Sequence, residues 1–204
     1  MRSLLVLLAL LVATGCSQLE QVARDTLNGT LSSSPTTYDT AQGERVRFAL
    51  GAVAFADRVD SFRPTRELSA AYADPSQAVG PPDYDTDRCP SGDECYLTLT
   101  SGGVAVFEFT NNTLYDGPGD DLAIFEIGPD VEAMTVEISV DGRGYLMLGR
   151  VEGSSALLDI AGRGRSGAQY RFVRLTDDPE QGGSGGSTPG ADVDAVGAIH
   201  AEQR

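Results

Sequence analysis

Residues 136–151, VEISVDGRGYLMLGRV, decide the fold class of this chain. Apolar and polar side chains alternate on both sides of Asp141-Gly142-Arg143-Gly144, and such alternation is typical of strands that bury one face. An Asp-Gly pair between two such runs is a strong hairpin signal. The stretch therefore predicts two antiparallel strands, Thr135–Val140 and Tyr145–Val151, joined by a tight turn.

The same pattern recurs on both sides of this stretch. The other expected strands are Tyr96–Thr100, Val104–Thr110, Leu122–Ile127, Tyr170–Thr176 and Val193–His200. Ser101-Gly102-Gly103 separates the first two, which predicts a second hairpin. No segment carries a sustained 3.6-residue apolar stripe, so helices should be short and few. Seven or more short strands predict an all-β fold, an antiparallel jelly roll or similar sandwich.

The N-terminus has the features of an export signal. Arg2 precedes an apolar run over residues 4–13, which is too short for the roughly 20 residues that span a bilayer. Ala13-Thr14-Gly15-Cys16 resembles the lipobox of bacterial lipoproteins, in which the cysteine carries acyl chains such as palmitate. The alternative is an ordinary signal peptide cleaved near Gly15, which leaves Cys16 as a free thiol. The resemblance implies a lipid anchor in the cell envelope, in the outer rather than the inner membrane.

The composition of the chain indicates three regions. We expect a signal peptide over residues 1–15, a lipidated Cys16 with a polar flexible tether to residue 44, and one domain over residues 45–204. The chain has a formal charge of -15, and it carries -16 once Arg2 is removed. Such an acidic surface repels nucleic acid, so nucleic acid is excluded as a partner. Since Cys16 is assigned to lipid, Cys89 and Cys95 remain, and an oxidising compartment favours a disulfide between them.

Several segments together resemble a known family. The stretch 136–151 and YRFVRLTD at 170–177 are similar to paired segments of discoidin-like, galactose-binding-type jelly rolls. YADPSQAVGPPDYD at 72–85, VFEFTNNTLYDGPGDDLAIFEIG at 106–128 and ADVDAVGAI at 191–199 resemble bacterial cell-surface proteins with that fold. The chain lacks the Trp that sugar-binding members commonly expose, and residues 84–94 are an insertion. The resemblance implies loops at one end of the sandwich that present a ligand site.

Acidic residues suggest a calcium ion at two places. Asp83, Asp85, Asp87 and Glu94 have the spacing of an oxygen-ligating loop. Arg88 and Pro90 exclude a true EF-hand, and the alternative is a solvated acidic loop. The preferred set is Asp121, Glu126, Asp192 and Asp194, whose segments the family resemblance places together. Close carboxylates repel one another, so a hard cation such as structural Ca²⁺ would stabilise them; the alternative is that they only shape turns.

Three further features of the sequence give weaker indications. Residues 182–190, GGSGGSTPG, are either a phosphate-binding loop or, as we prefer, a mobile connection. Gly162-Arg163-Gly164-Arg165 is a small basic segment that either contacts an anionic partner or forms a solvated turn. His200 is the only histidine, which disfavours a Ser-His-Asp triad or a zinc site.

These observations favour a non-catalytic binding module over an enzyme. We expect its ligand to be carbohydrate or another surface molecule of the envelope. The alternative is a structural or assembly lipoprotein that binds an envelope protein. A pocket rimmed by Tyr, Arg and Asp would favour carbohydrate, and a large exposed apolar patch would favour a protein partner. A hydrolase that uses two carboxylates is the remaining alternative.

Overall fold

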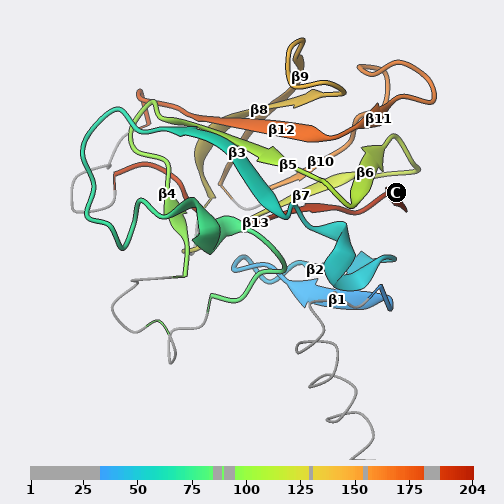
Figure 1. Ribbon diagram of the computed structural model, residues 1–204, viewed down its shortest axis with the longest axis horizontal. Helices are drawn as coiled ribbons and strands as arrows, with labels where there is room; N and C mark the ends of the chain where they lie inside the picture. Colours follow the sequence, from blue (N-terminus) through green and yellow to red (C-terminus); the bar gives the residue numbers. More distant parts are fainter. Residues whose placement is uncertain (1–32, 85–88, 90–94, 129–130, 154–155, 182–188) are drawn as a thin grey trace, which may run out of the picture. The chain divides into compact units, whose positions relative to one another are not determined.

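A computed structural model describes residues 33–84, 89, 95–128, 131–153, 156–181 and 189–204. In these ranges the regular structure consists of β-strands and two short 3-10 helices (Figure 1). The elements are β1 (Thr36–Asp39), β2 (Arg45–Phe48), η1 (Gly51–Ala54), β3 (Arg58–Arg63), η2 (Pro75–Ala78), β4 (Leu97–Thr98), β5 (Val104–Glu108), β6 (Asn112–Tyr115), β7 (Leu122–Glu126), β8 (Val131–Ser139), β9 (Leu146–Gly153), β10 (Leu157–Leu158), β11 (Gln169–Tyr170), β12 (Phe172–Asp177), β13 (Asp192–Ala198) and β14 (Ala201–Gln203).

The strands form four antiparallel sheets. The two larger sheets have the strand orders β3-β5-β12-β8-β9 and β10-β7-β13-β4, and the smaller ones are β11-β6-β14 and β1-β2. Each of the seven strands expected from the sequence is present, with ends that differ by a few residues. The all-β, antiparallel prediction is confirmed. The hairpin at Asp141–Gly144 is also confirmed, because β8 pairs with β9 across it.

The hairpin predicted at residues 101–103 is wrong. β4 pairs with β13, whereas β5 pairs with β3 and β12 in the other sheet. Thr100 and Gly102 both have a positive φ, 67° and 78°, and these left-handed residues turn the chain from one sheet to the other. A glycine-containing connection between two apolar runs does not reveal whether the two strands pair with each other.

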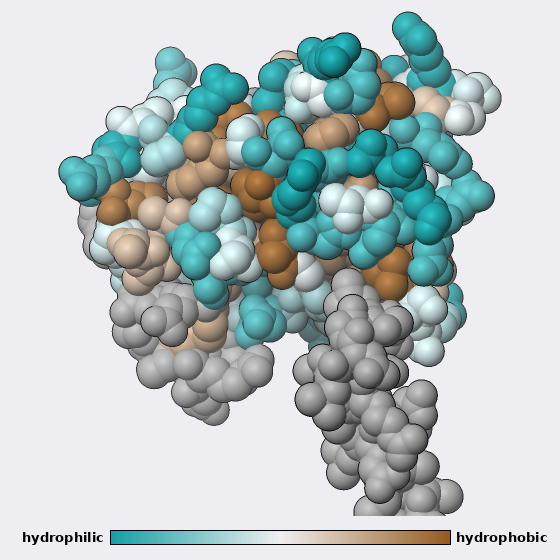
Figure 2. All heavy atoms as spheres, viewed as in Figure 1, coloured by the Kyte–Doolittle hydropathy of each residue, from teal (hydrophilic) through white to brown (hydrophobic). Residues whose placement is uncertain are grey.

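The two larger sheets share one hydrophobic core. Leu97, Leu122, Ile124 and Val193 from one sheet and Phe107, Val136, Ile138 and Val173 from the other belong to the same buried cluster. The burial of apolar side chains is the main favourable contribution to folding. The outer face of the five-stranded sheet is more polar, because β8 and β12 expose alternate residues there. Figure 2 shows hydrophilic residues over much of the surface in this view, with hydrophobic ones between them.

A second cluster covers the other face of the four-stranded sheet. Phe48 and Phe55 contact Phe125 of β7, with ring centroids 6.1 and 5.8 Å apart, and Tyr38 of β1 lies 5.1 Å from Phe55. β7 is therefore buried on both faces, which explains its continuous apolar run Leu-Ala-Ile-Phe.

This packing corrects the predicted domain boundary. The compact unit begins at Ser33, and β1 lies inside the segment expected to be a tether up to residue 44. β1 has the sequence Thr-Thr-Tyr-Asp, and only Tyr38 packs into the core. So polar a strand carries no apolar alternation that a sequence pattern could detect.

Candidate functional site

The turn between β8 and β9 is held by its own side chains. Ser139 Oγ accepts a hydrogen bond from Gly142 N at 3.0 Å, and Asp141 Oδ1 accepts one from Arg143 N at 2.9 Å. Gly142 has φ of 75°, and a Cβ there would lie 3.3 Å from the ring of Phe172. The turn therefore has one defined conformation, which glycine at position 142 permits.

A second ordered loop connects β10 to β11. Arg163 N donates to Ile160 O, and Ala168 N donates to Arg165 O, each at 3.0 Å. Between the two arginines, Gly164 lies directly on Tyr170, since a Cβ at this position would be 2.5 Å from Tyr170 Oη. The missing side chain of Gly164 thus allows the loop to pack on the sheet with an arginine on either side of the contact.

A pocket of about 480 Å³ lies between this loop and the turn. Tyr145, Arg163 and Arg165 line it together with Asp141, and the buried Tyr170 forms part of its wall. The remaining lining residues are Ile138, Ser139, Val140, Gly144, Leu146 and Ala168. Apolar walls with a few charged and aromatic groups are typical of small-molecule binding pockets.

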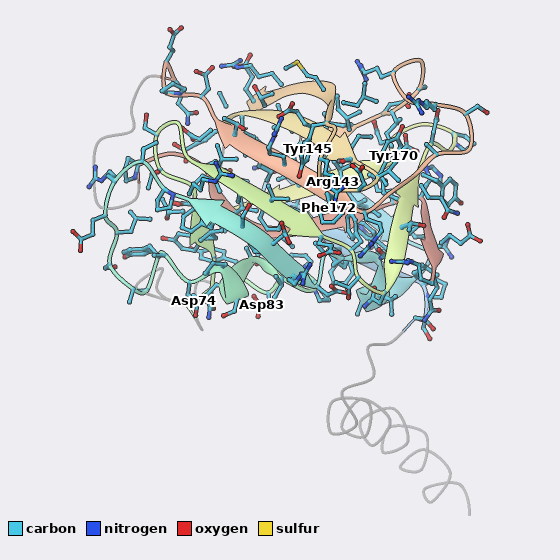
Figure 3. The ribbon with its side chains drawn as sticks, turned by 45° about the horizontal axis from the view of Figure 1, so that its top comes forward. Asp74, Asp83, Arg143, Tyr145, Tyr170 and Phe172 are labelled. Carbon is cyan, nitrogen blue, oxygen red and sulfur yellow. A yellow bond between two sulfur atoms is a disulfide. The ribbon has the colours of Figure 1, made fainter. Side chains whose placement is uncertain are left out.

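Tyr145 also borders a second hollow, of about 550 Å³, on the outer face of the five-stranded sheet. Here the guanidinium of Arg174 stacks on the Tyr145 ring at 4.0 Å, and it donates to both oxygens of Glu137 at 2.5 and 2.6 Å. Figure 3 shows Arg143, Tyr145 and Phe172 near one another. The stacking and the two-pronged ion pair fix the orientation of Tyr145 before any ligand arrives.

The ionisation states around the first pocket suit hydrogen bonding. Burial raises the pKa of Tyr145, so its hydroxyl stays protonated at neutral pH and can donate. The backbone N–H groups of Arg143 and Gly144 lower the pKa of Asp141, which therefore stays a carboxylate and accepts. The pocket combines a neutral hydroxyl, a carboxylate and two guanidinium groups.

The structure does not bring the four preferred calcium ligands together. β7 and β13 are antiparallel, so Asp121 before β7 lies beside the end of β13, and Glu126 lies beside its start. Asp192 and Asp194 are therefore on the Glu126 side. The predicted calcium ion uses some of these four residues, and the pairing of β7 with β13 separates Asp121 from the other three.

Asp121 has partners of its own. It is fully buried, and its two oxygens accept hydrogen bonds from Gly117 N at 2.7 Å and Ile160 N at 2.8 Å, with His200 Nδ1 at 2.9 Å. Asp116 and Asp159 lie near enough that one ligand atom from each aspartate falls within 4.8 Å of the others. Among the described residues this is the group of three acidic side chains that a metal could join. These hydrogen bonds give Asp121 a structural role, because they join the segments around Gly117, Ile160 and His200.

At the other end, Glu126 and Asp194 line a pocket of about 360 Å³ beside β1. Glu126 is only 3% exposed, and its Oε2 has no hydrogen-bond partner among the residues that the structure describes. Burial and the nearby Glu132 raise the pKa of Glu126 to about 9, and burial raises that of Asp194 to about 7. Asp194 accepts hydrogen bonds from Asp83 N and Tyr84 N, at 3.2 and 3.4 Å.

Asp192 is not among the described residues that line this pocket. Its Oδ1 accepts a hydrogen bond from Thr98 Oγ1 at 2.5 Å across the β4–β13 pair. Glu126 and Asp194 thus remain as a pair of buried carboxylates that share a pocket. A carboxylate oxygen without a partner, in a pocket that a second carboxylate also lines, is the type of ligand that a cation such as Ca²⁺ prefers.

Other predicted residues are placed only in part. A disulfide joins Cys89 to Cys95, as predicted, with their Cα atoms 6.3 Å apart. Asp83 is described, whereas Asp85, Asp87 and Glu94 lie outside the described residues, as do Cys16 and most of the segment 182–190. No helix in the described ranges is long and apolar enough to cross a membrane.

The Arg163–Arg165 segment could be recognised from the sequence, but the pocket that it lines could not. Arg-Gly-Arg is visible in the sequence, and so is the aromatic residue after the Asp-Gly turn. Only the fold reveals that these two segments, about 20 residues apart in the chain, face the same hollow.

Comparisons with known proteins add little to this geometry. No protein-family model matches the chain, and no curated protein matches it. Among solved structures, a chain described as a glycoside hydrolase aligns with 68% of this chain, at 11% sequence identity and a TM-score of 0.32. The aligned part is 31% of that chain, so this protein spans less than a third of its length. A likeness at this score carries no argument about fold or activity.

Proposed function

We propose that this chain is a lipid-anchored, extracytoplasmic binding module of the bacterial envelope, and that it binds carbohydrate without catalysis. The observation that carries the proposal is the 480 Å³ pocket lined by Tyr145, Arg163, Arg165 and Asp141. Sugars present hydroxyl groups around an apolar ring face. A hydrogen-bonding rim beside an aromatic side chain complements both features.

The rigid walls of the pocket support a binding role. The turn at Asp141 is fixed by hydrogen bonds to its own backbone, and the opposite loop is fixed by Gly164 on Tyr170. A site that is ordered before binding loses less conformational entropy when the ligand arrives. The finer fold proposal agrees with this arrangement: a galactose-binding-type jelly roll carries its ligand site on loops at one end of the sandwich.

Binding is favoured over hydrolysis by the composition of this pocket. Of the described residues that line it, Asp141 alone is a carboxylate. Glycosidases generally use two carboxyl groups that flank the scissile bond. A single carboxylate that is committed to its own turn supports recognition rather than acid–base chemistry.

A structural cation forms part of the proposal. Glu126 and Asp194 would hold it, with Asp121 outside the site. A bound Ca²⁺ would supply charge compensation for two carboxylates that are buried together. It would also join β7, β13 and the segment around Asp83, since Asp194 already accepts from that segment.

The alternative function is the docking of an envelope protein. β9 is the edge strand of the five-stranded sheet, and Met147 on it is 60% exposed, with Val140 in the adjacent turn 51% exposed. An edge strand can accept a strand from a partner. In the described residues these are the two large hydrophobic side chains classed as exposed, so the apolar surface that they offer is small.

The two functions are separated by one set of variants. Full-length protein in detergent is applied to an array of neutral and acidic envelope glycans, and hits are measured by calorimetry. We expect Tyr145→Ala to weaken glycan binding by at least about tenfold, since it removes the aromatic wall. Tyr115→Ala, at the β6 end near His200, is the matched control. The alternative would be supported if no glycan binds and the protein instead captures an envelope protein. In that case Met147→Ala should abolish the capture.

A further inference from the structure

Arg163 and Arg165 line the pocket without an ion-pair partner in the described part of the chain, whereas several arginines elsewhere on the surface have one. Arg58, Arg150, Arg171 and Arg174 each form an ion pair with a carboxylate, as the distances between their charged groups show. Among the described residues, neither Arg163 nor Arg165 forms one. Two unpaired guanidinium groups in one pocket are notable in a chain with a formal charge of -15, because acidic partners are abundant.

The loop holds both arginines at the pocket. Arg163 Nη1 donates to Asp159 O at 2.6 Å, which orients the guanidinium and leaves its remaining N–H groups available. Gly164 packs against Tyr170 between them. The guanidinium of Arg163 is therefore held by a contact within the loop, and the hydrogen-bonded backbone of the loop places Arg165 at the pocket.

Asp141 does not neutralise this pair. Its Oδ1 accepts hydrogen bonds from the backbone of Arg143 and Gly144, at 2.9 and 3.3 Å, so it serves the turn. With two arginines and one aspartate, the pocket lining has a net positive charge of one unit. A ligand with a single negative charge balances it, whereas a doubly charged phosphate would exceed it and would also be repelled by Asp141.

We propose that the ligand of this pocket is an acidic saccharide whose carboxylate, as in a uronic acid, is bound by Arg163 and Arg165. The inference rests on the proposed carbohydrate function and names its ligand class. Guanidinium groups match planar carboxylates with paired hydrogen bonds, which gives both affinity and orientation. The Tyr145 side chain and the apolar wall then contact the sugar ring.

The acidity of the rest of the chain does not prevent such binding. Charges are screened over roughly 8 Å at physiological ionic strength, so distant carboxylates act weakly on a ligand in the pocket. The two arginines act at contact distance. The general negative charge instead repels polyanions that do not fit the pocket, which adds selectivity.

The test uses full-length protein in detergent and a matched pair of probes, methyl galacturonoside and its methyl ester, at constant ionic strength. The ester has the same sugar ring without the charge. We expect the acid to bind at least about tenfold more tightly than the ester. The double variant Arg163→Gln with Arg165→Gln should remove this preference. Arg47→Gln with Arg66→Gln makes the same change in charge at exposed positions outside the pocket and should leave it intact.

A second variant tests position independently of charge. Gly164→Ala keeps both arginines but forces the loop away from Tyr170, so it should also reduce the preference for the acid. Its melting temperature reports whether the domain stays folded. Sulfated and phosphorylated galactose serve as competitors, and stronger competition by either than by galacturonate would refute the carboxylate assignment.

The outcomes separate the two proposals. Equal binding of acid and ester, lost in Tyr145→Ala but unchanged in the Arg163/Arg165 variant, overturns the acidic ligand and leaves carbohydrate binding in place. The absence of binding to methyl galacturonoside, its ester and every glycan of the array overturns both. A preference for the acid that the Arg47/Arg66 control also loses would assign it to overall charge and overturn the site.

Discussion

His200 Nδ1 lies 2.9 Å from Asp121 Oδ1, and this contact joins the end of β13 to the start of β7. Asp121 also accepts hydrogen bonds from Gly117 and Ile160, so one buried carboxylate connects three separate segments. Gly117 packs against the histidine, because a Cβ there would lie 2.4 Å from its ring. The aspartate that the sequence suggests as a metal ligand is the centre of a hydrogen-bonded latch.

The first prediction concerns this latch. Asp121→Asn replaces one acceptor oxygen by an NH₂ group that faces an N–H donor, so we expect a loss of about 2–4 kcal/mol in the free energy of unfolding. Denaturant titration measures it. Asp116→Asn, at an exposed neighbour, should change stability by less than about 0.5 kcal/mol. Equal effects of the two changes would refute the latch.

The second prediction concerns calcium. If Ca²⁺ binds at Glu126 and Asp194, a hundredfold excess over Kd stabilises the folded protein by about 2.7 kcal/mol. The melting temperature should rise with calcium and fall with chelator, and Glu126→Gln with Asp194→Asn should abolish the response. Asp116→Asn with Asp159→Asn should preserve it. If that control pair abolishes the response instead, the cation is bound beside Asp121.

The third prediction concerns pH in the presence of chelator. The pKa of Glu126 is raised from 4.5 to about 9, so between these values the folded protein holds a proton that the unfolded chain has released. This contribution to stability is complete below pH 4.5 and is lost as the pH rises towards 9, at up to about 1.4 kcal/mol per pH unit. Melting measured from pH 5 to 9 should show this fall, and Glu126→Gln should make it shallower. Since calcium requires the deprotonated carboxylates, its stabilising effect should grow over the same interval. A wild-type curve parallel to that of Glu126→Gln would contradict the assignment.

The fourth prediction concerns the disulfide. Cys89 and Cys95 enclose a short loop, and the loss of such a cross-link costs about 2 kcal/mol through the entropy of the unfolded chain. Cys89→Ser with Cys95→Ser should lower the melting temperature without a change in glycan affinity, because neither residue lines the 480 Å³ pocket. Mass spectrometry without reduction identifies the bond in the parent protein. Free thiols in freshly isolated protein would be the contrary result.

The fifth prediction concerns the anchor. Cys16→Ser removes the proposed site of acylation, so the variant should partition into the aqueous phase of a detergent separation while its domain keeps the parent melting temperature. Each acyl methylene that leaves the membrane removes about 0.8 kcal/mol of binding. A variant that stays in the membrane fraction would show that something other than lipid on Cys16 retains it.

The sequence predicted what depends on local pattern. β7, β8, β9 and β12 were recognisable because β-branched and aromatic residues recur in short runs between turn residues. The turn at Asp141 was recognisable because its chemistry is contained in four consecutive residues. The disulfide followed from a count of cysteines.

What the sequence could not predict depends on pairing between distant segments. Asp121 and Glu126 lie at opposite ends of β7, and only the antiparallel pairing of β7 with β13 places Asp192 and Asp194 at the Glu126 end. The pocket likewise depends on the loop at Arg163 meeting the turn at Tyr145. β1 was missed because its packing against the core depends on a single aromatic side chain, Tyr38, which contacts Phe55.

If lipid on Cys16 anchors the chain as proposed, the packing of β1 and β2 on the four-stranded sheet limits how proteolysis can release the domain from the membrane. A cut after Tyr38 would remove the side chain of β1 that packs on Phe55, and the shed fragment would expose aromatic surface to water. Such a fragment would be prone to aggregation and further degradation. Only cleavage before Ser33 leaves the compact unit whole, so a soluble, functional form would have to begin at or before that residue.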